Sequence, residues 1–176
     1  RPGAQVTALD ASAEMLGVAR RRLAQAKLRA NVARADAQAL PVASQSMDLV
    51  VCLRLLMHVV DWQRAIEELC RVSARRLVID FPAARTFAAL EAASRARAAK
   101  AGRPVEAYRV FGAAEVEGAL ARHGFRVVTR HRQFVLPIAA HKAVGRLSVT
   151  RAVERSLAAI GALRLFGSPV TLVAER

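Results

Sequence analysis

Two carboxylates, Asp10 and Asp36, each follow a short apolar run in the first part of the chain. The pattern predicts strands over Gln5–Leu9 and Asn31–Ala35, so each acid stands at the carboxyl end of a strand. In an open parallel sheet these ends line one crevice, where ligands bind. One acid can accept both hydroxyls of a ribose, and the other can accept an adenine amino group while the Ala37 backbone N–H reaches a ring nitrogen. The pair predicts a nucleoside site, although a carboxylate at such a position can also simply cap a helix.

A second group of candidates follows the run "DLVVCL", Asp48–Leu53, whose apolar character predicts a strand buried on both faces. His58 falls in the loop after it and is a candidate general base, or a histidine packed on its neighbours. Arg54 is a candidate for binding a carboxylate or phenolate, or for an ordinary salt bridge.

The elements that must position these residues alternate short apolar runs with amphipathic patterns, which predicts an α/β fold with a mostly parallel sheet flanked by helices. Ser12 is a candidate helix cap, and Asp61 caps a further helix. The inward faces of these two helices are predicted to consist of Met15, Ala19, Leu23 and Ala26 in the first and Ile66, Leu69 and Cys70 in the second.

The second helix and the later part of the chain carry further predicted features. Glu67 is placed to pair with Arg71 four residues on. A strand is expected over Arg76–Phe81, and two late strands over Phe125–Val135 and Pro169–Ala174. The late strands are separated by a helical stretch, 138–165, which is too long for a tight hairpin turn. Gly124 is well placed as a left-handed helix cap.

Composition narrows the class of protein. The chain has 176 residues, 54% of them hydrophobic, and a net charge of +14 from 28 basic and 14 acidic residues. The basic residues are spread over every segment, so they predict no specific nucleic-acid surface. Cys52 and Cys70 belong to no metal-ligand or CxxC spacing, and no signal peptide or membrane-length apolar run is visible. We therefore expect a cytoplasmic protein with reduced thiols and no metal.

Three stretches in order carry a resemblance to a known family: "VTALDASAEMLGVARRRL", "ADAQALPVASQSMDLVVCLRLLMHV" and "WQRAIEELCRV". Together they resemble successive motifs of the Rossmann-like, class I S-adenosylmethionine-dependent methyltransferases, and most of all the small-molecule "type 11" branch of ubiquinone and menaquinone biosynthesis. The likeness covers about Val6 to Phe81 and continues more weakly in "FGAAEVEGALARHGF". It implies a single methyltransferase-like domain over 1–176 that uses S-adenosyl-L-methionine.

The resemblance also assigns roles. Asp10 would bind the ribose hydroxyls, and Asp36 the adenine amino group. The remaining residues implied at the cofactor are Ala11, Ser12 and Met15 beside the sugar and adenine, Ala37 and Gln38 at the adenine edge, and Leu53 and Arg54 at the methionine part. The segment "YRVF" lies where the family places acceptor-facing residues, so Tyr108, Arg109 and His58 are implied at the acceptor.

The chain departs from the family at one important place. The family's first strand and its G-x-G loop would lie before Arg1, and no two glycines of this chain stand two apart. We therefore expect an N-terminally truncated methyltransferase, and we expect the 176 residues alone to be inactive. The isolated residues are expected to bind S-adenosylmethionine weakly or not at all.

The acceptor is expected to be a small aromatic or lipophilic molecule. The segment 138–165 combines apolar faces with Lys142, Arg146, Arg151 and Arg155, which is typical of a lid over such an acceptor or of a helix resting on an anionic membrane. Two other functions stay open: a non-catalytic nucleoside-binding or scaffold protein, and an RNA-directed methyltransferase. Against the latter, no "NPPY"-like motif follows "DLVVCL".

Overall fold

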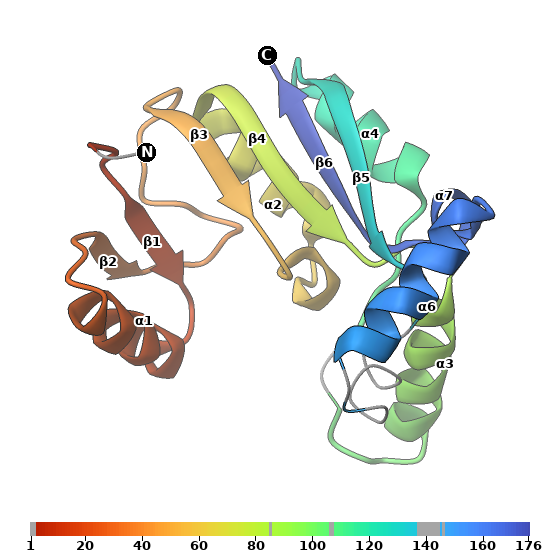
Figure 1. The fold of residues 1–176 in the computed structure, drawn as a ribbon. Helices are drawn as coiled ribbons and strands as arrows, with labels where there is room; N and C mark the ends of the chain where they lie inside the picture. Colours follow the sequence, from red (N-terminus) through yellow and green to blue (C-terminus); the bar gives the residue numbers. More distant parts are fainter. Residues whose placement is uncertain (1–2, 85, 106–107, 137–144, 146) are drawn as a thin grey trace.

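The computed structural model describes residues 3–84, 86–105, 108–136, 145 and 147–176. Strands and helices alternate through its first half (Figure 1). The elements are β1 (Thr7–Asp10), α1 (Ala13–Gln25), β2 (Asn31–Arg34), β3 (Met47–Cys52), the 3-10 helix η1 (Leu56–His58), α2 (Trp62–Val72), β4 (Ser73–Phe81), α3 (Phe87–Lys100), α4 (Ala113–Arg122), β5 (Arg126–Phe134), α6 (Leu147–Ala159), α7 (Ala162–Phe166) and β6 (Ser168–Glu175).

The described strands form two sheets. β1 pairs with β2 in parallel, and the other four strands lie in the order β3-β4-β6-β5. β3 and β4 are parallel, whereas β6 runs antiparallel to both β4 and β5. The late antiparallel pair is thus confirmed, and the sheet that was expected to be mostly parallel is mixed. Figure 1 shows β1 and β3 running in the same direction with their free edges facing each other.

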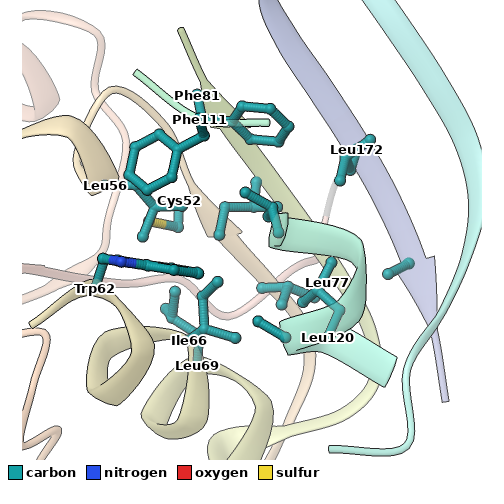
Figure 2. Close-up of a cluster of buried hydrophobic side chains, with 14 of the residues drawn as sticks. Cys52, Leu56, Trp62, Ile66, Leu69, Leu77, Phe81, Phe111, Leu120 and Leu172 are labelled. Atoms are coloured by element: carbon teal, nitrogen blue, oxygen red, sulfur yellow. The ribbon is translucent and has the colours of Figure 1, made fainter. Parts of the chain in front are cut away.

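The main core lies on one face of the four-stranded sheet, under α2 and α4. The aromatic side chains of Trp62 and Phe81 both pack edge-on against Phe111, at ring-centroid distances of 5.3 and 5.9 Å (Figure 2). Leu77 of β4 and Ile66 of α2 are fully buried beside them. The inward face predicted for α2 is confirmed, because its three residues are all buried.

The opposite face of β3 is open, so the prediction of a strand buried on both faces is wrong. Leu49, Val51 and Leu53 are 53, 55 and 52% exposed. Successive side chains of a strand point to opposite faces. Cys52 therefore turns toward the core, and its odd-numbered neighbours turn away from it. Among the described residues, a row of half-exposed apolar side chains therefore remains on and just after a strand that pairs along one edge.

The apolar stripe predicted on α1 is also wrong in part. Met15 is more than half exposed and Ala26 is exposed, whereas Leu16 is the buried residue. α1 packs on a sheet of only two strands. The buried face of α1 is therefore narrow, and it is centred one residue away from the predicted face. The cap is confirmed: the Ser12 hydroxyl accepts a hydrogen bond from the Met15 N–H at 3.2 Å.

Helix α2 passes directly into β4, since it ends at Val72 and the strand begins at Ser73. Asp61 caps its start by accepting from the Arg64 N–H at 3.0 Å, as predicted. The predicted pair of Glu67 with Arg71 is wrong. Glu67 pairs with Arg64, which leaves Arg71 to bind Glu68.

The later elements follow the sequence pattern closely. Gly124 has a φ of +79° after α4, as its predicted role as a left-handed cap requires. The expected helical segment 138–165 contains α6 and all but the last residue of α7, while residues 138–144 and 146 lie outside the described residues. None of the helices that the structure describes is long and apolar enough to cross a membrane.

Candidate functional site

The structure places Asp10 and Asp36 at the same edge of the β1–β2 sheet. Asp10 is the last residue of β1 and lies opposite Arg34, the last residue of β2. The Asp10 carbonyl accepts a hydrogen bond from the Ala35 N–H at 3.1 Å, so the backbone of Asp36 begins one residue past this bond. Both carboxylates are exposed. Parallel pairing thus brings the two ends together, as the sequence pattern predicts.

Each of the two acids is held by its own turn. Asp10 Oδ1 accepts from the Ser12 N–H at 2.8 Å, and Asp36 Oδ1 accepts from the Gln38 N–H at 2.9 Å. The Gln38 amide also donates to both Asp36 oxygens at 3.3 Å. These bonds fix how the carboxylates are oriented, and no described donor contacts the second oxygen of Asp10. A pair of vicinal hydroxyls fits that geometry.

The other residues expected around the nucleoside lie on the same edge. The Ala11 carbonyl accepts from Arg34 Nε at 2.8 Å, which ties the turn after β1 to β2. Met15 is exposed in the first turn of α1, next to the Ser12 cap. Ala37 is half-buried and packs against the main core, while the Gln38 side chain accepts from the Asp61 N–H at 3.2 Å.

A buried acid that the sequence analysis did not single out, Asp80, holds the end of β3. Arg54 has a positive φ of 57°, and its backbone N–H donates to Asp80 Oδ1 at 2.5 Å. Burial raises the pKa of this carboxyl, while the bond from Arg54 opposes the rise. The signal was present in "RLVIDF", because Asp80 is a third acid close to the carboxyl end of a strand.

His58 and Tyr108 meet beyond these strand ends. Their ring centroids lie 6.2 Å apart at an interplanar angle of 66°. The contact is possible because the Arg109 N–H donates to the Met57 carbonyl at 3.0 Å, which lays residues 108–111 against η1. Arg95 of α3 stacks over the Tyr108 ring, 4.8 Å from its centroid.

The electrostatics of Tyr108 favour a neutral phenol. Burial, followed by the nearby charge of Glu91, raises its pKa above the ordinary value, although Arg54 and Arg95 act in the opposite direction. Tyr108 therefore remains protonated at neutral pH, so its hydroxyl can donate a hydrogen bond.

Arg109, the other residue implied at the acceptor, directs its side chain toward the aromatic residues of the main core. Its guanidinium lies over the Trp62 and Phe111 rings at 5.5 Å and donates to Glu115 at 3.3 Å. The structure therefore brings His58 and Tyr108 together and directs Arg109 elsewhere. Within the part of the chain that the structure describes, no group of three His, Cys, Asp or Glu side chains could hold a metal ion.

The acids Asp10 and Asp36 lie at the same edge of the molecule as the pair formed by His58 and Tyr108. Figure 1 shows the arrowheads of β1, β3 and β4 at one edge, with α3 and α6 beyond it. The edge offers two acids suited to a nucleoside and, farther along, a histidine beside a tyrosine. Such an arrangement can hold a nucleoside-containing cofactor next to a second, aromatic or apolar molecule.

Comparison with known proteins shows what the chain is similar to. Residues 1–76 match the family profile of the methyltransferase domain. The chain is 36% identical over 84 residues to the demethylmenaquinone methyltransferase of Thermus thermophilus, an alignment that covers 46% of this chain and 38% of the relative. These matches agree with the sequence resemblance: the first part of the chain is similar to the methyltransferase domain family.

Solved structures show the same fold over almost the whole chain. Magnesium protoporphyrin IX methyltransferase from Synechocystis PCC 6803, solved with bound S-adenosylhomocysteine, superimposes with a TM-score of 0.63 at 18% identity, covering 99% of this chain and 65% of that one. A methyltransferase from Methanosarcina mazei gives 0.68 at 15% identity, covering 99% and 82%.

One structural neighbour has a different chemistry. The [4+2]-cyclase SpnF gives a TM-score of 0.65 at 18% identity, covering 98% of this chain and 66% of that one. The fold therefore does not fix the reaction. The chain spans 38% of the length of its curated relative and about two thirds of some of these structures.

Proposed function

We propose that the chain is part of an S-adenosylmethionine-dependent methyltransferase that acts on a small aromatic or lipophilic acceptor. The observation that carries the proposal is the meeting of Asp10 and Asp36 at the carboxyl ends of two paired parallel strands. Nucleosides bind at such ends in open α/β sheets, where carboxylates accept the ribose hydroxyls. The match of residues 1–76 to the methyltransferase domain supports the same reading.

The described residues fit the adenosine end of the cofactor. Asp10 would hold the ribose hydroxyls with its uncontacted oxygen, and Asp36 and Ala37 would meet the adenine edge. Leu53 and Arg54 would border the methionine part, where the charge of Arg54 also acts to lower the pKa of both Asp80 and Tyr108. The cofactor itself would supply a methyl group on a positively charged sulfur. The residues of this chain would bind, orient and exclude water around it.

We further propose that a strand from outside these 176 residues lies between β1 and β3 in the complete enzyme. In the described structure β1 pairs only with β2, and β3 pairs only with β4. Unpaired strand edges are unfavourable in a stable protein. A parallel strand there would pair both edges, and a further element packed on the open face of the sheet would cover half-exposed apolar side chains such as Val51. A glycine-rich loop after it would allow the backbone to approach the methionine carboxylate.

His58 and Tyr108 are the proposed acceptor residues. Their edge-to-face contact and the stacked Arg95 form an aromatic wall beyond the ends of β3 and β4. A phenolic or enolic acceptor must lose a proton as it is methylated, and His58 is the proposed base for that proton. The neutral hydroxyl of Tyr108 is suited to orient an acceptor oxygen.

Helix α6 is the proposed lid. Glu154 accepts hydrogen bonds from the Val135 and Leu136 N–H groups at 2.9 Å, which holds α6 at the carboxyl end of β5. At about 100° per residue, Val149 and Val153 of α6 and Ile160 just past its end lie on one exposed apolar stripe. Arg151 and Arg155 lie on the far side of the helix from it. This separation suits a lid over an apolar acceptor, and it equally suits a helix whose apolar face rests on an anionic membrane.

The proposal is tested by titrating the full-length protein with S-adenosylhomocysteine in a calorimeter. Replacing Asp10 by Asn should weaken binding by roughly ten- to a hundredfold, because hydrogen bonds to a charged acceptor contribute about 1.5–3 kcal/mol. Asp48→Asn is the matched control, since Asp48 is an exposed acid near the opposite end of β3. Equal effects of the two changes, or no binding by the full-length protein, would favour a scaffold.

A further inference from the structure

The connection between β2 and β3, residues 36–45, carries the residues proposed to meet adenine. It makes two short turns of its own: the Ala39 N–H donates to the Asp36 carbonyl at 3.0 Å, and the Val42 N–H donates to the Leu40 carbonyl at 2.8 Å. Backbone groups left over in a half-buried loop need partners elsewhere if the loop is to keep one shape. Helix α2 supplies these partners.

Glu68 and Arg71, one turn apart on α2, bind the middle of the loop. Glu68 Oε2 accepts from the Leu40 N–H at 2.7 Å, while Arg71 donates to the Leu40 carbonyl at 2.9 Å and to the Val42 carbonyl at 2.8 Å. The two side chains therefore contact both the donor and the acceptor of Leu40, as a neighbouring strand would. The Arg71 carbonyl also accepts from the Gln45 N–H at 2.8 Å.

The two side chains also depend on each other. Glu68 is only 4% exposed and receives two hydrogen bonds from Arg71, at 2.7 and 2.9 Å. The bonds from Arg71 lower the pKa of Glu68, so the acid stays charged. A buried carboxylate without its cation is strongly unfavourable, so removing either partner should release the loop as well as the pair.

A second set of contacts holds the start of the loop. The Gln38 carbonyl accepts from Arg64 Nε at 3.3 Å, and the Gln38 side chain accepts from the Asp61 N–H at 3.2 Å. Gln38 in turn donates to Asp36. A continuous series of hydrogen bonds therefore runs from α2 to the carboxylate that is proposed to contact adenine.

We propose that Glu68 and Arg71 are positioning residues for the adenine end of the cofactor, acting through the shape of the 36–45 loop. The inference rests on the proposed function, because it assigns the loop a nucleoside to receive. Neither side chain needs to touch the ligand to play this part. The adenine edge is instead read by Asp36 and Ala37, whose placement depends on bonds made one to six residues farther along the chain.

The experiment compares Glu68→Gln and Arg71→Lys with Glu117→Gln in the full-length protein. Glu117 of α4 pairs with Arg130 of β5, so its variant removes an ion pair away from the loop. Amide hydrogen exchange reports the loop without any ligand: we expect faster exchange at Leu40 and Gln45 in both α2 variants and no change in β4 or β6. Titration with S-adenosylhomocysteine should show affinity lowered roughly five- to tenfold, as expected for one or two lost hydrogen bonds.

The two measurements separate the possible failures. Unchanged exchange at Leu40 in Glu68→Gln would overturn the positioning role whatever the ligand data show. Faster exchange with unchanged affinity would overturn it as well, because the loop would then be irrelevant to the ligand. A native protein that binds no adenosyl ligand would instead overturn the proposed function, while the exchange data would still decide whether the pair shapes the loop.

Discussion

The backbone N–H of Arg54 donates a hydrogen bond to the buried carboxylate of Asp80, which links the residue after β3 to the end of β4. The bond holds Arg54 in a left-handed conformation, with φ at +57°, that a residue with a side chain adopts only at a cost. It thereby fixes the entrance to η1, the 3-10 helix that carries His58.

The raised pKa of Asp80 predicts a specific pH dependence of stability. Its pKa in the folded chain lies above the unfolded value of about 3.9, so the fold favours the protonated acid. The contribution of Asp80 is therefore fully present below the unfolded pKa and is lost as pH rises through the folded pKa. Asp80→Asn keeps an oxygen for the Arg54 N–H but cannot ionise.

The measurement is urea denaturation of both proteins from pH 4 to pH 8. We expect Asp80→Asn to become more stable relative to the native chain as pH rises. Two curves that stay parallel over this range would contradict the prediction.

The open face of β3 predicts that one substitution has different effects in two contexts. In the 176-residue chain Val51→Asp should change the free energy of unfolding by less than about 0.5 kcal/mol, because the side chain is half exposed. In the full-length protein, where we propose that further elements cover it, the cost should exceed about 2 kcal/mol. Val50→Asp is the control, since Val50 packs on the core and should destabilise both. Equal small effects of Val51→Asp would argue against a covering segment.

The two cysteines should be inert in the folded protein. Burial raises the pKa of both the Cys52 and the Cys70 thiol to about 12. The reactive thiolate is therefore scarce at pH 8, and both side chains are closed to solvent. Iodoacetamide followed by mass spectrometry should label neither residue until denaturant is added. Rapid labelling of one of them under native conditions would show that its part of the core opens.

Trp62, the sole tryptophan, is buried while its Nε1 has no hydrogen-bond partner among the described residues. Trp62→Phe should therefore be much milder than Trp62→Ala. We expect the truncation to alanine to cost about 3–5 kcal/mol and the change to phenylalanine clearly less, because no indole hydrogen bond is lost. Denaturation followed by circular dichroism measures both. Similar losses would mean that the indole N–H has a partner after all.

Gly167, between α7 and β6, lies against neighbouring chain segments too closely to accept a side chain. A Cβ atom there would overlap the Leu163 carbonyl oxygen and approach the Arg132 Cβ to 2.7 Å. Gly167→Ala should therefore destabilise by about 1–3 kcal/mol. Gly118→Ala in α4 is the matched control, because it has room and should stabilise by roughly 0.5–1 kcal/mol. Thermal unfolding of both variants tests the contrast.

Local signals in the sequence predicted most elements and caps. Ser12, Asp61 and Gly124 each act as a cap within a few residues of their partners, so spacing alone was enough to find them. The proximity of Asp10 and Asp36 could also be predicted from the sequence, because parallel strands joined by one helix bring their carboxyl ends together.

The features that sequence reasoning missed depend on contacts across long separations. Glu68 binds Leu40 across 28 residues, and nothing in the α2 pattern distinguishes Glu68 from Glu67 as the partner of Arg71. The exposure of Leu49 and Val51 likewise depends on what covers β3, which a run of apolar letters does not reveal. Tertiary context decided both.

The strand order β3-β4-β6-β5 carries a consequence for how the protein is made. β6 is the last of these strands to leave the ribosome, yet it lies between β4 and β5 and supplies all the pairing that β5 has in the described structure. Both edges of β5 therefore stay unpaired until residues 168–175 have been synthesised. Closure of this sheet is a late, long-range event, which exposes the nascent chain to aggregation in the meantime.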